Sequence, residues 1–186
     1  LALEVDPREW RDRRIFHHVS ISSQRIEREA PGQRTVLVNE NNKWTMTEPV
    51  STRVDQKALK KFFQNLGSAR LGEFIIDQPD QLAQFGLHDP RGSLTVRTER
   101  QKKGSDGERV ERETDTQTLL IGSRVGGSTQ DRFAMIDGRP VVFRLPAKIL
   151  LQLFQQPQQL IEPTGTDVPA ADVKVVRIDG PEGSFK

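Results

Sequence analysis

One amphipathic segment, residues 55–66, constrains the fold of this chain more than any other feature of its sequence. Its apolar side chains recur at helical spacing and form a single stripe, made of Ala58, Leu59, Phe62, Phe63 and Leu66. Asp55 precedes the stripe and suits an N-cap, and Gly67 follows it, where helices commonly stop in a left-handed conformation. The segment therefore predicts a helix over residues 55–66 with one face packed on a core.

Two segments near this helix are typical of β-hairpins. Residues 34–46 alternate apolar and polar side chains before and after an asparagine-rich turn. Residues 132–145 turn near Asp137-Gly138, and a four-residue loop there pairs Ala134 with Phe143. Both faces of this second hairpin are largely apolar, so we expect its sheet to be covered on both sides.

The fold class that follows is α+β. Antiparallel β-hairpins form a sheet that is packed by two main helices, at residues 55–66 and 146–156. Residues 73–77 are expected as a short buried strand, and residues 6–14 as a short helix. The charged stretch at 100–115 lacks apolar periodicity and predicts a solvated hairpin tip or loop.

The stretch "LAQFGLHDPRGS" at residues 82–93 could either cradle a ligand or simply turn the chain. Gly86 is expected at the left-handed end of a short helix, a conformation that glycine tolerates best. Leu87 then folds back on Leu82, which is the apolar contact of a Schellman motif. The pattern therefore favours a role in backbone geometry.

The chain is expected to divide into an α+β domain at residues 1–162, a linker at 163–172 and a strand at 173–186. The linker combines two prolines with small residues and has no apolar period. Arg25-Ile26-Glu27 and Arg177-Ile178-Asp179 are similar, which predicts one unit of a repeated module whose second copy starts at the C-terminal strand. Because the chain does not begin with Met, we expect it to be a piece of a longer protein.

The charge and cysteine content exclude several classes of function. The 28 basic and 26 acidic residues are interleaved and leave a net charge of +2, which argues against a nucleic-acid partner. The chain has no cysteine, so disulfides, thiolate catalysis and cysteine-based zinc sites are excluded. No apolar run approaches 18 residues, so we expect no direct membrane insertion by this segment.

The histidines are weak candidates for chemistry. On a strand, the adjacent pair His17-His18 would point to opposite faces and could not easily bind one metal ion. His88 could pair with Asp89 or Asp77 as a base, but a solvated turn histidine is the more common situation.

The remaining candidates are equally weak. Gly126-Gly127 could form a phosphate-binding nest, but the segment lacks the Gly-Lys-Ser/Thr end of a P-loop. Acidic pairs such as Asp77/Asp80 and Glu111/Glu113 would need to face one another across a cleft, and no GxSxG nucleophile motif occurs. The sequence therefore predicts no catalytic residue, no cofactor and no metal ligand.

Three motifs carry a family resemblance. They are "WTMTEP" at residues 44–49, "FGLHDP" at 85–90 and "LLIG" at 119–122, and their order and spacing resemble the bacterial DUF4340 family over roughly residues 14 to 162. Phe85 stands where the family usually has Tyr, and His88 where Asp or Glu is common. The shared positions are structural in type: Trp44, Pro49, Gly86, Leu87, Pro90 and Gly122.

The resemblance implies a location and an architecture rather than an activity. Members of the family are similar in having an N-terminal membrane anchor, several copies of the unit and an outward-facing soluble part, and are often encoded beside ABC-transporter or gliding-type components. We therefore expect a non-enzymatic, extracytoplasmic protein-interaction module of a membrane-anchored bacterial protein, using strand edges or the 100–115 loop to bind an envelope protein partner. The alternative is a small-ligand binder or hydrolase with a pocket near His88 and Gly126-Gly127.

Overall fold

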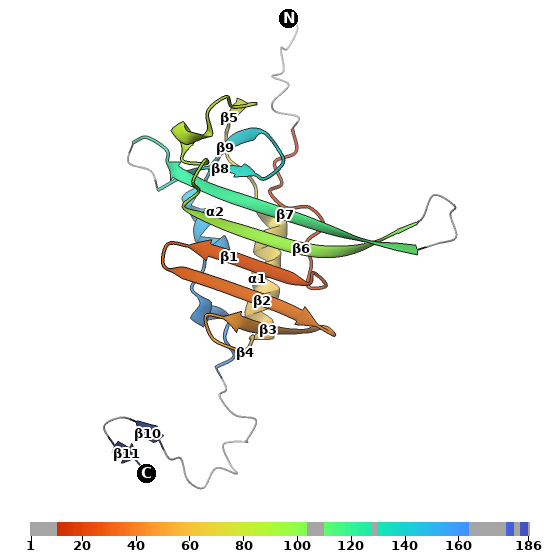
Figure 1. Ribbon diagram of the computed structural model, residues 1–186, viewed down its shortest axis with the longest axis vertical. Coiled ribbons are helices and arrows are strands. Elements are labelled where there is room, and N and C mark those ends of the chain that lie inside the picture. Colours follow the sequence, from red (N-terminus) through yellow and green to blue (C-terminus); the bar gives the residue numbers. More distant parts are fainter. Residues whose placement is uncertain (1–10, 104–109, 128–129, 164–177, 181–182, 186) are drawn as a thin grey trace, which may run out of the picture.

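Nine strands within the described residues form one antiparallel sheet, in the order β4-β3-β2-β1-β6-β7-β8-β9-β5 (Figure 1). The computed structural model describes residues 11–103, 110–127, 130–163, 178–180 and 183–185. In chain order the elements are β1 (Arg25–Ala30), β2 (Gln33–Glu40), β3 (Lys43–Glu48), β4 (Thr52–Arg53), α1 (Gln56–Ser68), β5 (Phe74–Asp77), the 3₁₀ helix η2 (Leu82–Phe85), β6 (Gly92–Lys103), β7 (Val110–Arg124), β8 (Arg132–Ile136), β9 (Val141–Leu145), α2 (Ala147–Leu153), the 3₁₀ helix η3 (Pro157–Leu160), β10 (Ile178–Gly180) and β11 (Gly183–Phe185). The α+β class, the antiparallel hairpins and the two packing helices are confirmed.

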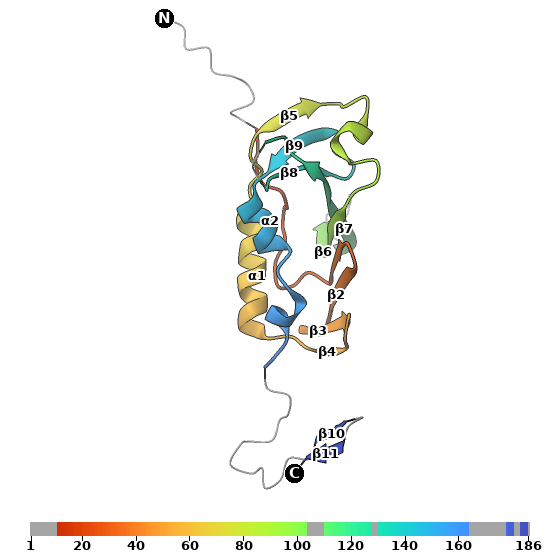
Figure 2. The same ribbon diagram turned by 90° about the vertical axis from the view of Figure 1, so that its left-hand side faces the viewer.

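Both helices cover the same face of the sheet (Figure 2). The apolar stripe of α1 is buried there, since Leu59, Phe62 and Leu66 have no exposed surface. They meet sheet residues such as Leu37 and Leu119, which are also fully buried, in one continuous apolar core. Burial of a leucine or phenylalanine side chain contributes about 1.5–3 kcal/mol, so each of these side chains stabilises the contact between α1 and the sheet.

The predicted start of α1 is confirmed, but its predicted stop is wrong. The Asp55 carboxylate accepts hydrogen bonds from the backbone N–H groups of Lys57 and Ala58, at 2.7 and 3.1 Å. Gly67, however, lies inside the helix, and Ala69 closes it with extended backbone at φ −61° and ψ 127°. The extended exit places Ala69 beside the N-terminal segment, whose Ile15 N–H donates to the Ala69 carbonyl at 3.2 Å.

The β8–β9 hairpin has the predicted register, because Ala134 lies opposite Phe143. Both of its faces are covered, also as predicted. Ala134 and Phe143 belong to the main core under the helices, while Met135 and Val142 pack on the opposite face with Leu87. The segment that contains η2 crosses this second face (Figure 2).

Strand β5 is not buried, in contrast to the prediction for residues 73–77. It pairs only with β9 and forms one end of the sheet. Ile75 and Ile76 are exposed to 36% and 38%. The run of apolar letters suggested burial because periodicity alone cannot distinguish a central strand from an apolar edge strand.

Of the two alternatives predicted for residues 100–115, a solvated hairpin tip or a loop, the structure shows a hairpin. β6 continues to Lys103 and β7 begins at Val110, so a long antiparallel hairpin extends through most of this stretch. Alternating charges do not prevent strand formation when both backbones pair with one another. The tip itself, residues 104–109, lies outside the described residues.

The second helix is shorter than predicted. It ends at Leu153 rather than near residue 156, and the chain then turns through Phe154 into η3. The Arg28 guanidinium, 4% exposed on β1, donates to the carbonyls of Leu153 and Gln155 at 3.3 and 2.8 Å. A side chain from the sheet therefore satisfies carbonyl groups that a longer helix would have satisfied internally.

The chain termini agree only in part with expectation. Residues 11–14 of the predicted 6–14 helix are not helical, because the segment pairs with the chain after α1 through a bridge between Arg14 and Arg70. Residues 1–10 and 164–177, which include nearly all of the predicted linker, lie outside the described residues. In the predicted C-terminal strand, β10 and β11 pair antiparallel with one another. The domain division and the repeated module stay predictions.

Candidate functional site

A cavity of about 440 Å³ opens beside the exposed strand β5. Its apolar lining consists of Leu71, Phe74, Ile136 and Phe143, which belong to the core that α1 covers, together with Pro140 and Val141. Its polar lining is formed by Arg11, Asp12, Arg14, Asp77, Gln78 and Arg139. The cavity therefore combines an apolar surface with a charged rim.

The N-terminal segment is held across β5 by an ion pair and by stacking. The Arg11 guanidinium donates two hydrogen bonds to the Asp77 carboxylate, at 2.6 and 2.8 Å. Its carbon lies 5.3 Å from the centre of the Phe74 ring, within the range of a cation–π contact. Arg11 and Asp77 are each close to half exposed, so the pair serves more to position the segment than to stabilise the fold.

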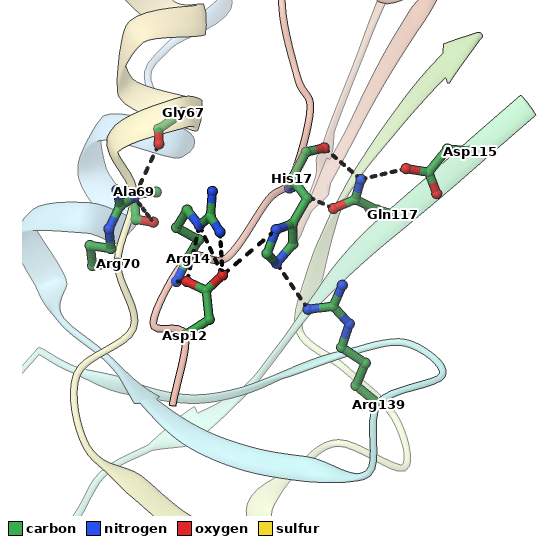
Figure 3. Close-up of polar contacts among 9 residues, drawn as sticks. All are labelled: Asp12, Arg14, His17, Gly67, Ala69, Arg70, Asp115, Gln117 and Arg139. Carbon is green, nitrogen blue, oxygen red and sulfur yellow. Dashed lines mark hydrogen bonds and ion pairs between the residues drawn. The ribbon is translucent and has the colours of Figure 1, made fainter. Parts of the chain in front are cut away.

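Behind this pair, two arginines from opposite segments lie side by side. Arg14 and Arg70 are antiparallel bridge partners, which places their side chains on one face. The Arg14 guanidinium is bound by Asp12, whose pKa is held well below its usual range by hydrogen bonds from the Arg14 side chain and backbone. Arg70 instead donates to the carbonyls of Gly67 and Ala69 at the end of α1, as Figure 3 shows, and has no carboxylate partner among the described residues.

His17 connects this cluster to the β8–β9 turn (Figure 3). Its Nε2 lies 3.3 Å from Nη1 of Arg139, and because the guanidinium can only donate, Nε2 is the acceptor and Nδ1 carries the proton. Nδ1 faces the Asp12 carboxylate at 3.9 Å. Burial lowers the pKa of His17 below 6.5, and the positive charge of Arg139 lowers it further.

The buried side chain of Gln117 fixes the position of His17. Its Oε1 accepts from the His17 N–H and its Nε2 donates to the His17 carbonyl, both at 2.8 Å. The same Nε2 also donates to Asp115 at 2.8 Å. The amide thus pairs with the backbone of His17 much as a neighbouring strand would, and holds the N-terminal segment on β7.

Arg139, like Arg70, has no carboxylate partner among the described residues. It lies in the β8–β9 turn, is exposed, and its polar contact among the described residues is the His17 ring. It lines both the cavity beside β5 and a polar concavity of about 360 Å³ around His17. An anionic group that entered either space would meet Arg139.

A second, larger concavity of about 870 Å³ lies at the opposite end of the sheet, near β4. Its charged lining mixes Lys43, Arg53, Lys57, Asp55 and Glu162. Asp55 is already committed to the α1 cap, and the backbone of Glu162 bonds to Arg53 at this edge. This edge is thus partly covered by the chain itself.

The residues that the sequence singled out do not form a site together. His88 is exposed and has no ion pair or hydrogen bond among the described residues, and Asp77, one of its two predicted carboxylate partners, is bound by Arg11 instead. An added Cβ at Gly126 or Gly127 would meet no atom within 4 Å, so no other part of the chain packs against these two glycines at that position. His17 and His18 lie in bends rather than on a strand, with ring centres 6.3 Å apart. In the described part of the chain, no group of three or more His, Asp or Glu side chains could hold a metal ion.

Comparison with known proteins identifies a family. The family model described as "Domain of unknown function (DUF4340)" matches residues 44–186. The chain belongs to the DUF4340 family. No curated protein and no solved structure matches it. The matched range begins at Trp44, later than the resemblance from motifs suggested, and leaves β1 and β2 outside it.

Two of the three motifs that carry the family resemblance, "FGLHDP" and "LLIG", are in direct contact. Gly86 is left-handed, at φ 66° and ψ 26°, and the N–H groups of Gly86 and Leu87 donate to the carbonyls of Ala83 and Leu82, both at 3.0 Å. This is the hydrogen-bond pattern of the predicted Schellman motif. A Cβ on Gly86 would lie 2.8 Å from the backbone nitrogen of Ser123.

Gly122, the glycine of "LLIG", lies on the other side of the same contact. A Cβ on Gly122 would overlap the carbonyl oxygen of Phe85 and come within 3.1 Å of the Leu87 side chain. The "FGLHDP" turn and the end of the "LLIG" strand are therefore packed backbone against backbone. A side chain at either Gly86 or Gly122 would obstruct this contact.

The "WTMTEP" motif packs against helix α1 through Trp44. Trp44 is 3% exposed, its ring centre lies 5.4 Å from that of Phe63 on α1, and its Nε1 donates to the Ile21 carbonyl at 2.9 Å. The motif residues thus pack on both faces of the sheet: Leu87 lies on the face covered by the η2 segment, and Trp44 on the face covered by α1. None of them lines the cavity beside β5.

Proposed function

We propose that this DUF4340 domain is a non-enzymatic protein-interaction module that binds its partner through the edge of β5. The single observation that carries the proposal is the exposed apolar edge formed by Ile75 and Ile76 at the end of the sheet. Edge strands are normally protected by charge, proline or a covering segment, because they can pair with other chains. At the opposite end, the bridge between Val54 and Ile161 provides such a cover.

We further propose that the domain is extracytoplasmic and part of a membrane-anchored bacterial protein, accessory to an ABC-transporter or gliding-type assembly. Membership of the family supports this part. Among the described residues, no helix combines the length and apolarity needed to span a bilayer.

Site-specific photocrosslinking tests the interaction. A benzophenone amino acid replaces Ile76 in the full-length protein, and the matched control carries it at Leu151 on α2, which is 73% exposed. We expect a crosslink to one discrete envelope protein from position 76 and none from position 151, and we expect Ile75→Lys to remove that crosslink. Equal crosslinking from both positions, or none from position 76, would contradict the proposal.

The absence of cysteine makes the proposed location directly testable. Leu151→Cys introduces a single exposed thiol, which a membrane-impermeant maleimide reaches in intact spheroplasts if the domain faces outward. Labelling only after lysis would refute an extracytoplasmic location without bearing on the interaction.

A further inference from the structure

We propose that the partner segment recognised at β5 is an acidic extended peptide, whose carboxylate binds Arg139 while its backbone pairs with the strand. This inference rests on the proposed function, because it names the chemistry of the partner at the same edge. Strand addition to an open sheet edge obtains affinity from backbone hydrogen bonds and specificity from pockets that receive alternate side chains. The cavity beside β5 is such a pocket.

The charges around the cavity favour an anion. Arg11, Arg14 and Arg139 line it, and Arg70 lies directly opposite Arg14, whereas Asp12 and Asp77 are the aspartates among its lining residues. The two aspartates are already paired with Arg14 and Arg11. Arg70 and Arg139 therefore remain without a carboxylate in the described part of the chain.

Of these two, Arg139 is the better placed. Its neighbour Pro140 accepts a hydrogen bond from the Gln78 N–H at 2.7 Å, so the β8–β9 turn is joined to the chain just beyond β5. The turn therefore lies next to the end of β5 on its β9 side, and Arg139 lines the cavity together with Phe74 and Asp77 of β5. The guanidinium meets a neutral imidazole and can exchange it for a carboxylate, which is the stronger hydrogen-bond acceptor.

The apolar part of the cavity favours apolar side chains in the peptide next to its acidic residue. Phe74, Val141 and Phe143 line it beside the arginines. Alternate residues of a strand point to the same face, so a peptide with an acidic residue beside apolar ones can satisfy the rim and the apolar surface at once.

A membrane surface or a nucleic acid fits less well. Glu73 and Asp80 flank β5, and both are exposed. An extended anionic surface would meet these carboxylates, whereas a single carboxylate directed at Arg139 would not. The mixture of charges thus favours one acidic side chain over a polyanion.

Nuclear magnetic resonance titration of the whole chain tests the inference. The probes are two synthetic peptides, acetyl-Thr-Val-Glu-Val-Thr-Val-amide and the same peptide with Lys in place of Glu. We expect the Glu peptide to shift the amide signals of Ile75–Asp77 and the Nε–H signal of Arg139. It should bind roughly tenfold more tightly than the Lys peptide, because a charge-assisted hydrogen bond contributes at least that factor.

Three variants separate the contribution of Arg139 to peptide binding from that of the β5 edge. Arg139→Gln should abolish the preference for the Glu peptide while leaving weak binding of both, whereas Arg97→Gln, an equal change of charge at another exposed arginine, should leave the preference unchanged. Ile76→Lys should weaken both peptides.

The outcomes distinguish this inference from the proposed function. Equal binding of the two peptides at β5 would overturn the acidic specificity and leave edge docking intact. Loss of both peptides together with a negative crosslink from position 76 would overturn both proposals. Binding of vesicles made of equal parts phosphatidylcholine and phosphatidylglycerol, or self-association in analytical ultracentrifugation that Ile76→Lys removes, would assign the surface to a membrane or to a second copy and overturn the acidic peptide.

Discussion

Four glycine-to-alanine substitutions separate the two reasons why a glycine is needed in this fold. Gly86 is left-handed and also lies against Ser123, whereas Gly32 is left-handed at φ +72° with no atom within 4 Å of an added Cβ. Gly122 has no positive φ but lies against Phe85, and Gly126 has neither constraint. The set therefore varies backbone strain and close packing independently.

The expected magnitudes follow from these two factors. A left-handed alanine costs about 1–2 kcal/mol, and alanine stabilises by about 0.4–1 kcal/mol through the unfolded chain, so Gly32→Ala should cost about 1 kcal/mol. Overpacking costs about 1–3 kcal/mol, and Gly122→Ala should reach the upper end because its neighbour is backbone. Gly86→Ala combines both effects and should cost about 3 kcal/mol, while Gly126→Ala should stay within about 0.5 kcal/mol.

Urea denaturation at 25 °C, followed by the fluorescence of the two tryptophans, measures these differences. The linear dependence on urea gives the free energy of unfolding of each variant. If Gly86→Ala costs no more than Gly32→Ala, the close approach of the turn to β7 is refuted. If Gly122→Ala is neutral, the interlocking of the two family motifs is refuted as well.

The remaining predictions concern the helices and His17. Asp55→Ala should lower the free energy of unfolding by about 1 kcal/mol, because two N–H groups at the start of α1 lose their acceptor, and Asp55→Asn should recover most of it in the same urea assay. Arg28→Ala should cost about 3 kcal/mol, since it opens a cavity beside Phe62 and leaves two carbonyls at the end of α2 without a donor; a cost below about 1 kcal/mol would show that those carbonyls find other partners. Because the pKa of His17 is lower in the folded chain than the 6.5 of an ordinary histidine, the unfolded chain binds more protons as the pH falls below about 6.5, so stability should decrease there and His17→Gln should flatten the decrease. An unchanged pH dependence of the urea midpoint in His17→Gln would contradict this.

The elements that were predicted correctly are those specified by short stretches of sequence. The stripe of α1, its Asp55 cap and the Gly86 turn depend on residues within one or two turns of each other, so their pattern is visible in the sequence. The predicted stop at Gly67 is wrong because a glycine at the end of an apolar stripe can itself lie inside the helix. The chain stayed helical through Ser68 and left in an extended conformation to pair with the N-terminal segment.

The candidate site could not be predicted for the opposite reason. Its contacts join Arg11 to Asp77, and His17 to Gln117 and Arg139, across 66 to 122 residues of sequence. Nothing in the residue types marks these pairs, since arginine and aspartate are frequent in this chain. The apolar run at 73–77 indicated a strand next to the site, but a buried strand and an exposed edge strand can have the same apolar sequence.

The correctly predicted motifs nevertheless determine how the site can work. The turn at Gly86 and Leu87 covers one face of the β8–β9 hairpin, and the helices cover the other. The hairpin is thereby fixed on both sides, and its turn presents Arg139 beside β5, which within the described residues pairs with β9 alone. A surface held in this way would lose little conformational entropy if a partner strand were added, and such preorganisation would favour binding at the four-residue strand β5. The glycine variants that loosen the Gly86 turn should therefore also weaken peptide binding at β5, although none of these glycines lines the cavity.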